Sequence, residues 1–191
     1  MRGSKYIQSK QGNTFKDVKV DLLTGRNVLY SGTSCQVAGL RGYLGKDYDN
    51  LFYLDIVCHG VPSPKVWSEY LEWQERRNNA RVKSVDFFNK EDFGWRNHIE
   101  TLRFDNGKCV SSGIFKHLFY CHTILRPSCY ECPYKSIMHP GDIKIADYWG
   151  IEKAAPEFDD NKGVSLVLVN KEVGVHILDA VKTRWNGNRP G

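Results

Sequence analysis

The first part of the chain alternates between apolar residues at helical spacing and short apolar runs. From Thr14, apolar residues recur on one face of a predicted helix that Gly25 ends. Residues 27–31 form an apolar run that favours a buried strand, residues 35–44 have helical spacing, and residues 51–57 form a second apolar run. Strand, helix and strand make the βαβ pattern, so we expect the two strands to be parallel.

The pattern changes further along the chain. Ser63 and Pro64 begin a long predicted helix, as the cap and the first helical residue. Asn106-Gly107 then favours a hairpin with a type I′ turn. We expect strands at 82–88, 97–104, 108–111, 142–148 and 164–169, helices at 113–121 and 171–185, a loop-rich stretch at 123–141 and a stop at 186–191. The predicted fold class is α/β (mixed α+β), in which a βαβ start leads into a mixed sheet flanked by helices and a cysteine-bearing loop region.

Composition narrows the class of protein. The 191 residues are 41% hydrophobic and 26% charged, which is typical of a globular domain, so we expect a single domain over residues 1–191. The net charge of +5 is mild and dispersed, which argues against nucleic acid as a partner. No apolar run reaches the roughly 18 residues of a membrane span, and the N-terminus does not read as a signal peptide. We therefore expect a cytoplasmic protein without a membrane span.

Six cysteines then become the informative feature, because structural disulfides are rare in a reducing compartment. Cys35 follows the first predicted strand at the start of a helix, where backbone N–H groups and the helix dipole stabilise anions and lower the pKa of a thiol. Cys58 follows the second strand. The carboxyl ends of parallel strands share one edge of a sheet, so these two thiols should converge where α/β sheets bind ligands.

A Cys-x-x-Cys turn adds Cys129 and Cys132, which makes four thiolates available. Four thiolates suit either tetrahedral zinc or an iron–sulfur cluster. A second interpretation stays open, in which Cys35 and Cys58 are small buried residues and the turn alone matters. The remaining two cysteines, Cys109 and Cys121, are better interpreted as buried filler or as incidental thiols.

Two further residues have both a functional and a structural interpretation. Asp147 ends an alternating strand and is followed by Tyr148-Trp149, which either contact a ring-bearing cofactor or pack in the core. His59 lies beside a proposed ligand, where it either contacts a cofactor or packs within its loop.

The four motifs together resemble a known family. In order they are Tyr30-Ser31-Gly32-Thr33-Ser34-Cys35-Gln36-Val37-Ala38-Gly39-Leu40, Asp55-Ile56-Val57-Cys58-His59-Gly60-Val61-Pro62-Ser63, Arg126-Pro127-Ser128-Cys129-Tyr130-Glu131-Cys132 and Asp142-Ile143-Lys144-Ile145-Ala146-Asp147-Tyr148-Trp149-Gly150. Their order and spacing resemble the C-terminal domain of the coenzyme F420 hydrogenase/dehydrogenase β-subunit family over about residues 5–185.

The resemblance implies an iron–sulfur flavoprotein. Family members hold FAD and a [4Fe–4S] cluster and pass electrons between partner iron–sulfur subunits and a small two-electron carrier, which is coenzyme F420 in the namesake members. The implied cluster ligands are Cys35, Cys58, Cys129 and Cys132. The residues implied to line the cluster and flavin region are Ser31, Gly32, Thr33, Gln36, His59, Gly60 and Asp147. Because the cofactors carry out the redox chemistry, no catalytic side chain is assigned.

Two departures from the family pattern matter. Ser34 stands where the family usually has proline, a mild change because serine is a good helix cap. The N-terminal segment with a ferredoxin-like cysteine cluster that family members carry is absent from these 191 residues. The sequence is therefore expected to be a fragment that corresponds to the C-terminal domain. Which electron carrier it uses does not follow from the resemblance.

Three other functions compete with electron transfer. The same four cysteines could together hold one structural zinc ion in a binding module. An inactive homologue could serve as an interaction module, with a link to polysaccharide synthesis. A thiol–disulfide enzyme using Cys129 and Cys132 ranks last, because no strand leads directly into a helix that starts at Cys129.

Overall fold

The computed structural model describes residues 6–185, and they form two compact units. Unit 1 consists of residues 6–10, 59–132 and 151–163, and unit 2 of residues 11–58, 133–150 and 164–185. The chain therefore passes between the units several times, at 10/11, 58/59, 132/133, 150/151 and 163/164. The stop expected at residues 186–191 lies outside the described residues.

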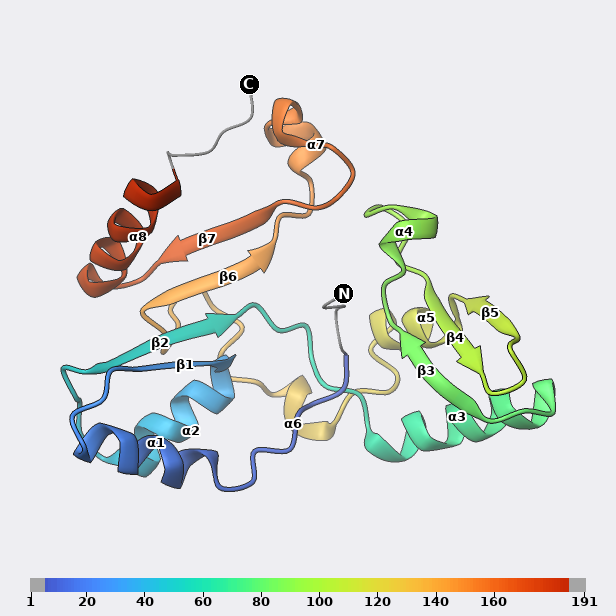
Figure 1. Cartoon of the computed structure of the whole chain (residues 1–191), viewed down its shortest axis with the longest axis horizontal. Coiled ribbons are helices and arrows are strands. Elements are labelled where there is room, and N and C mark those ends of the chain that lie inside the picture. The colour runs from blue at the N-terminus through green and yellow to red at the C-terminus, as the bar shows by residue number, and fades with distance from the viewer. Residues whose placement is uncertain (1–5, 186–191) are drawn as a thin grey trace. The chain divides into compact units, whose positions relative to one another are not determined.

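Unit 2 is built on a four-stranded mixed sheet (Figure 1). Its elements are α1 (Thr14–Leu23), β1 (Val28–Thr33), α2 (Ser34–Leu44), β2 (Leu51–Ile56), β6 (Ile143–Asp147), β7 (Ser165–Val169) and α8 (Glu172–Trp185). The strand order is β1-β2-β6-β7; β1, β2 and β6 run parallel and β7 is antiparallel to β6. The predicted βαβ start and the mixed sheet flanked by helices are both confirmed.

Helices pack on both faces of this sheet. Tyr30 and Tyr53 point to the face where α1 and α2 complete a buried apolar cluster with Val37 and Leu40. Ile143 lies on the opposite face, where α8 approaches closely at Gly174. A Cβ on Gly174 would lie 2.9 Å from Ile143 Cγ1, so this contact requires glycine.

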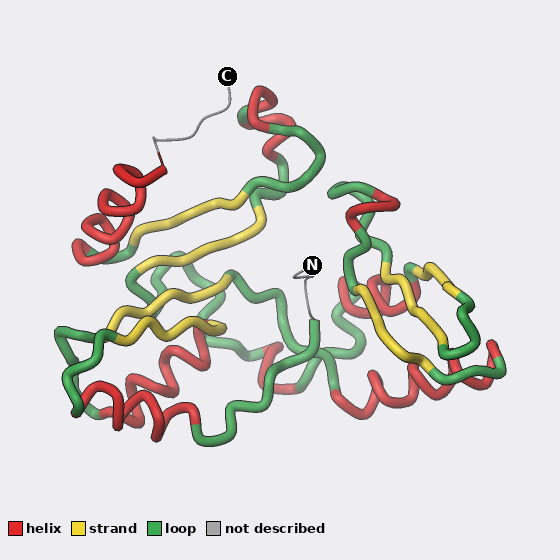
Figure 2. Tube along the Cα trace, in the orientation of Figure 1, coloured by secondary structure: helices red, strands yellow, loops and turns green. Residues whose placement is uncertain are grey.

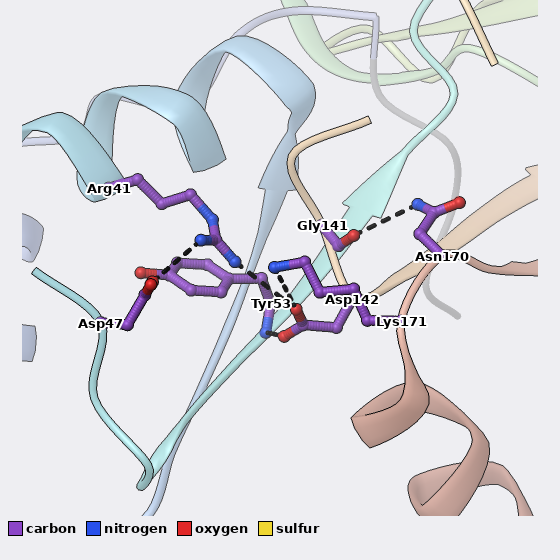
Figure 3. Close-up of polar contacts among 7 residues, drawn as sticks. All are labelled: Arg41, Asp47, Tyr53, Gly141, Asp142, Asn170 and Lys171. Carbon is purple, nitrogen blue, oxygen red and sulfur yellow. Dashed lines mark hydrogen bonds and ion pairs between the residues drawn. The ribbon is translucent and has the colours of Figure 1, made fainter. Parts of the chain in front are cut away.

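The amino end of β6 is fixed by the buried carboxylate of Asp142 (Figure 3). Its Oδ2 accepts the backbone N–H of Tyr53 at 2.8 Å. Its Oδ1 lies 3.1 Å from Lys171 Nζ and 3.5 Å from Arg41 Nη2. Arg41 also stacks over the Tyr53 ring and pairs with the exposed Asp47. One buried carboxylate thus joins β2, α2, β6 and the start of α8.

Unit 1 contains a separate antiparallel sheet in the order β3-β4-β5. Its elements are α3 (Pro64–Asn78), β3 (Val82–Asp86), α4 (Lys90–Phe93), β4 (Glu100–Phe104), β5 (Cys109–Ser112), α5 (Ile114–Tyr120), α6 (Pro127–Tyr130), α7 (Ile151–Ala154) and the 3-10 helix η1 (Pro156–Phe158). Ser63 and Pro64 begin α3 as predicted, and Gly107 turns the β4–β5 hairpin with a φ of 82°. Leu102 and Phe115 are among the core residues of this unit.

A buried polar group lies inside that core. Glu100 Oε1 accepts the backbone N–H of Phe115 at 3.0 Å and the Tyr70 hydroxyl at 3.2 Å. Gln74 donates to the same hydroxyl at 2.9 Å. Burial first, and the nearby Glu100 carboxylate in addition, raise the pKa of Tyr70 to about 12, so the phenol is neutral.

Two features of the fold differ from the sequence-based expectation. Strands β3, β4 and β5 form a sheet of their own rather than extending the mixed sheet, because they pair with one another and not with β1, β2, β6 or β7. The four-residue helices α4, α6 and α7 and the 3-10 helix η1 were also not predicted, since such short elements carry too few residues for a periodic pattern. Across residues 6–185, no helix is long and apolar enough to cross a membrane.

Candidate functional site

Three of the predicted site residues lie at the carboxyl edge of the parallel strands in unit 2. Cys35 is the second residue of α2, directly after β1, Cys58 follows β2 by two residues, and Asp147 is the last residue of β6. All three are exposed. Because the three strands are parallel, the expected placement at one edge of the sheet is realised within this unit.

The turn that carries Cys35 is held by its own residues. Gln36 Oε1 accepts the backbone N–H of Thr33 at 2.9 Å and the Thr33 hydroxyl at 3.1 Å. The Thr33 hydroxyl also lies 3.2 Å from Cys35 Sγ. A Cβ on Gly32 would meet Gln36 Oε1 at 2.9 Å, so glycine leaves space for this interaction. Gly32, Thr33 and Gln36 therefore have structural tasks in placing the thiol.

Beneath this turn lies a buried polar chain that the sequence analysis did not identify. Ser34 Oγ donates to Asp55 Oδ2 at 2.9 Å. His139 Nδ1 lies 2.9 Å from Ser34 Oγ and 3.2 Å from Asp55 Oδ2. Lys144 Nζ contacts the other ring nitrogen, Nε2 of His139. Asp55 has no exposed surface, and the His139 side chain is 3% exposed.

Strand register explains why these groups meet. Asp55 and Lys144 are direct partners in the parallel pairing of β2 and β6, so their side chains share a face of the sheet. Gly141 approaches the same carboxylate so closely that a Cβ there would lie 2.9 Å from Asp55 Cγ. The available sequence signal was Asp55 within the apolar run of β2 and Lys144 between two isoleucines of β6, because an ion in a buried strand requires partners.

His59, in unit 1, packs against aromatic rings. Its imidazole stacks on His122 with centroids 4.6 Å apart, and it lies 4.8 Å from the ring of Phe119. Partial burial, and then the neighbouring His122, lower the pKa of His59, so this ring is neutral near pH 7. The loop-packing interpretation thus has direct contacts to support it.

The Cys129 turn is fastened to the segment that follows His59. Pro62 and Leu125 form an antiparallel bridge, and the backbone N–H of Arg126 donates to the Val61 carbonyl at 2.9 Å. The Val61 N–H in turn donates to Cys129 Sγ at 3.4 Å. An N–H group directed at a cysteine sulfur stabilises negative charge on that sulfur, as a metal-bound thiolate requires.

Gly60, directly before Val61, adopts a φ of 151° and lies tightly against Leu125. A Cβ at this position would lie 2.8 Å from Leu125 Cδ1. Glycine at residue 60 is therefore explained by backbone geometry and close packing.

The four proposed ligands divide equally between the units, with Cys35 and Cys58 in unit 2 and Cys129 and Cys132 in unit 1. Within the described residues, no group of three or more His, Cys, Asp or Glu side chains is arranged to hold a metal ion. No disulfide bond joins any two of the six cysteines, all of which the structure describes. Figure 2 shows the stretch between α6 and β6, which contains Cys132, as loop.

Comparison with known protein families gives a match that covers most of the chain. The model of the C terminus of the coenzyme F420 hydrogenase/dehydrogenase β subunit matches residues 25–185. The chain belongs to this family. The resemblance expected from the four motifs is thereby confirmed, and the chain is a β-subunit-like domain of a family of redox enzymes.

A solved structure shares the fold of this family member. It is that of the F420-reducing [NiFe] hydrogenase complex from Methanosarcina barkeri, with a TM-score of 0.58 and 16% sequence identity. The match covers 100% of this chain and 62% of the hydrogenase chain, so the family member described here spans less than two thirds of its neighbour. A search of curated proteins gave no match.

Proposed function

We propose that this chain is the C-terminal domain of an iron–sulfur flavoprotein that transfers electrons between a [4Fe–4S] cluster, FAD and a small two-electron carrier. Membership of the coenzyme F420 hydrogenase/dehydrogenase β-subunit family is the observation that carries the proposal. The flavin supplies the exchange between two-electron and one-electron chemistry when it is bound. The side chains of this domain bind, orient and shield the cofactors, and we assign none of them a catalytic role.

The proposed cluster ligands are Cys35, Cys58, Cys129 and Cys132, and their chemistry fits the group. Each is a thiol, and none is fully buried, so iron can reach the sulfurs. The Val61 N–H already donates to Cys129 Sγ, and hydrogen bonds to cluster sulfurs tune reduction potentials. In sequence, Cys58 lies three residues before Val61, whose N–H donates to Cys129 Sγ.

The proposed flavin contacts are Ser31, Gly32, Thr33, Gln36, His59, Gly60 and Asp147. Ser31 and Asp147 are the two exposed polar side chains of this set at the carboxyl edge of unit 2, so we assign direct flavin contact first to them. Thr33 and Gln36 act through the Cys35 turn that they hold together.

Partners and setting follow from the same proposal. We propose that the domain works in the cytoplasm with other iron–sulfur or redox subunits, since the structural neighbour is a subunit of a hydrogenase complex. Coenzyme F420 is the carrier proposed by analogy with the namesake members of the family. Nucleic acid has no part in this function.

A zinc site formed by the four cysteines in a structural or interaction module is the second candidate, because zinc accepts the same four thiolates. Metal identity separates the two candidates, since only the cluster contains inorganic sulfide. An interaction module without any metal, including one linked to polysaccharide synthesis, would retain neither iron nor zinc.

Replacing Cys129 with serine is expected to remove at least nine tenths of the bound iron and sulfide, because a cluster held by three thiolates is readily lost. The measurement is iron, sulfide and zinc per chain after anaerobic reconstitution and gel filtration. Cys109→Ser is the matched control. Cys109 is an exposed thiol at the start of β5 whose neighbour is Arg103 Nη1, at 3.7 Å, and its replacement should leave the metal content unchanged.

Equal iron content in Cys129→Ser and the wild-type chain would refute the assignment of this ligand. Loss of iron in Cys129→Ser and also in Cys109→Ser would instead point to a site that includes Cys109. Zinc in place of iron and sulfide, lost on the Cys129 substitution alone, would establish the structural zinc module.

A further inference from the structure

The buried chain beneath the Cys35 turn contains opposite charges in direct succession. Asp55 lies in β2 with no exposed surface, and Lys144 lies beside it in β6 with 6% of its surface exposed. His139 stands between them, with one ring nitrogen toward Asp55 and the other toward Lys144. A buried lysine or carboxylate is costly unless it is compensated, so the pair is expected to have a task that an apolar pair could not fulfil.

The hydrogen bonds of this chain are mutually consistent. A lysine ammonium only donates, so His139 accepts at Nε2 and carries its proton on Nδ1. The Nδ1–H group then faces Ser34 Oγ and Asp55 Oδ2, while the Ser34 hydroxyl donates to Asp55. In this arrangement the network has one positive and one negative charge and no net charge. Burial lowers the pKa of Lys144 and the Asp55 carboxylate opposes that shift, so each ion depends on the other.

The network is joined directly to the Cys35 turn. Ser34 is the first residue of α2 and precedes Cys35, and Thr33 rather than Ser34 caps the helix. The Ser34 side chain is thus available for Asp55 and His139, and it is buried while Cys35 next to it is exposed. Asp55 Oδ1 has no hydrogen-bond partner among the described residues, so one oxygen of this carboxylate beneath the Cys35 turn is without a donor.

We propose that Asp55 and Lys144, bridged by His139, form a compensated charge pair that positions the Cys35 turn and sets the electrostatic potential at its sulfur. The significance of the pair rests on the proposed function, in which Cys35 is a cluster ligand. The charges of nearby side chains and hydrogen bonds to the sulfurs are the means by which a protein tunes such a group. Asp55, His139 and Lys144 are positioning residues in this account, because they act on Cys35 through Ser34.

The test compares two thiol reagents on the metal-free 191-residue chain at about pH 8, where an ordinary thiol is partly ionised. One is the anionic aryl disulfide 5,5′-dithiobis(2-nitrobenzoate), and the other is the neutral 4,4′-dithiodipyridine. For each reagent, the rate at which Cys35 is modified is followed by mass spectrometry of the peptide that contains Cys35. The same Cys35 thiolate attacks the disulfide of either reagent, forming a mixed disulfide and releasing the aryl or pyridyl thiolate. The ratio of anionic to neutral rates therefore reports the local potential, and the ionised fraction of the thiol cancels from it.

Asp55→Asn removes a negative charge and is expected to raise the ratio at Cys35 by about three- to tenfold. Lys144→Met removes a positive charge and should lower the ratio by a similar factor. The double variant should return to within about twofold of the wild-type chain. Cys121, an exposed thiol whose sulfur lies beside His117, is the internal control, and its ratio should stay constant in every variant.

Shifts of both single variants in the same direction, or unchanged ratios in chains that are folded by circular dichroism, would overturn the proposal. A purely structural role produces such a result, because either substitution would only loosen the turn. If Asp55→Asn does not fold, Lys144→Met alone decides, and a ratio that is unchanged or raised overturns the proposal.

The outcome is separable from that of the proposed function. If the rate ratio at Cys35 shifts in opposite directions in the two single variants and the wild-type chain binds no iron, the charge pair is established and the cluster is rejected. Unchanged ratios in a chain that binds iron and sulfide would reject the charge pair alone.

Discussion

Replacing Asp142 with alanine is expected to lower the free energy of unfolding by about 3 kcal/mol. The carboxylate is 4% exposed and holds Lys171, Arg41 and the backbone N–H of Tyr53 (Figure 3). Alanine leaves Lys171 without this counter-ion, leaves Arg41 with the exposed Asp47 alone, and leaves a buried N–H without an acceptor. The measurement is urea unfolding of the 191-residue chain, monitored by far-ultraviolet circular dichroism.

Asp47→Ala is the matched control because Asp47 binds the same guanidinium group from the outside. Its Oδ1 lies 3.1 Å from Arg41 Nη1, but the side chain is 89% exposed. An exposed ion pair contributes about 0–1 kcal/mol, so this variant should unfold near the wild-type midpoint. Equal losses for the two variants would mean that Arg41 pairing, and not the buried junction at Asp142, carries the stability.

Replacing Glu100 with alanine is expected to lower the free energy of unfolding by about 3 kcal/mol, through a cavity and two unpaired donors. The donors are the Phe115 N–H at the start of α5 and the Tyr70 hydroxyl. A second effect follows for the titration of Tyr70. Burial is the main cause of its raised pKa of about 12, and the Glu100 carboxylate adds to it, so the pKa should fall in the variant.

Urea unfolding gives the first effect and the phenolate absorbance during an alkaline titration gives the second. Glu91→Ala is the control, because Glu91 is exposed in the short helix α4. An unchanged or higher pKa for Tyr70 in Glu100→Ala would contradict the role given to this carboxylate.

Local patterns in the sequence were sufficient for most of the fold. Apolar periodicity placed α2 between β1 and β2, and Gly45, with a φ of 69°, ends α2 where the pattern stops. Ser63-Pro64 fixed the start of α3, and Asn106-Gly107 the hairpin. These elements depend on residues that are close in the chain. The division of the strands into two sheets depends on pairing partners far apart in sequence, which local patterns do not encode.

The candidate site was predicted in part for the same reason. Strand order placed Cys35 and Cys58 at one sheet edge, because that inference needs only the βαβ pattern. The contact between Asp55 and His139 joins residues 84 positions apart, as their numbering shows, and no motif connects them. The stacking of His59 on His122 likewise depends on tertiary packing.

The central claim is that the four matched cysteines serve a redox cofactor, and the metal content of the wild-type chain tests it most directly. The chain is purified anaerobically and analysed for iron, acid-labile sulfide, zinc and released flavin. The account predicts a brown protein with broad absorbance at roughly 400 nm and about four iron atoms and four sulfide ions per chain. It also predicts flavin that is released on denaturation. A colourless chain that holds one zinc ion, or no metal after reconstitution, would contradict it.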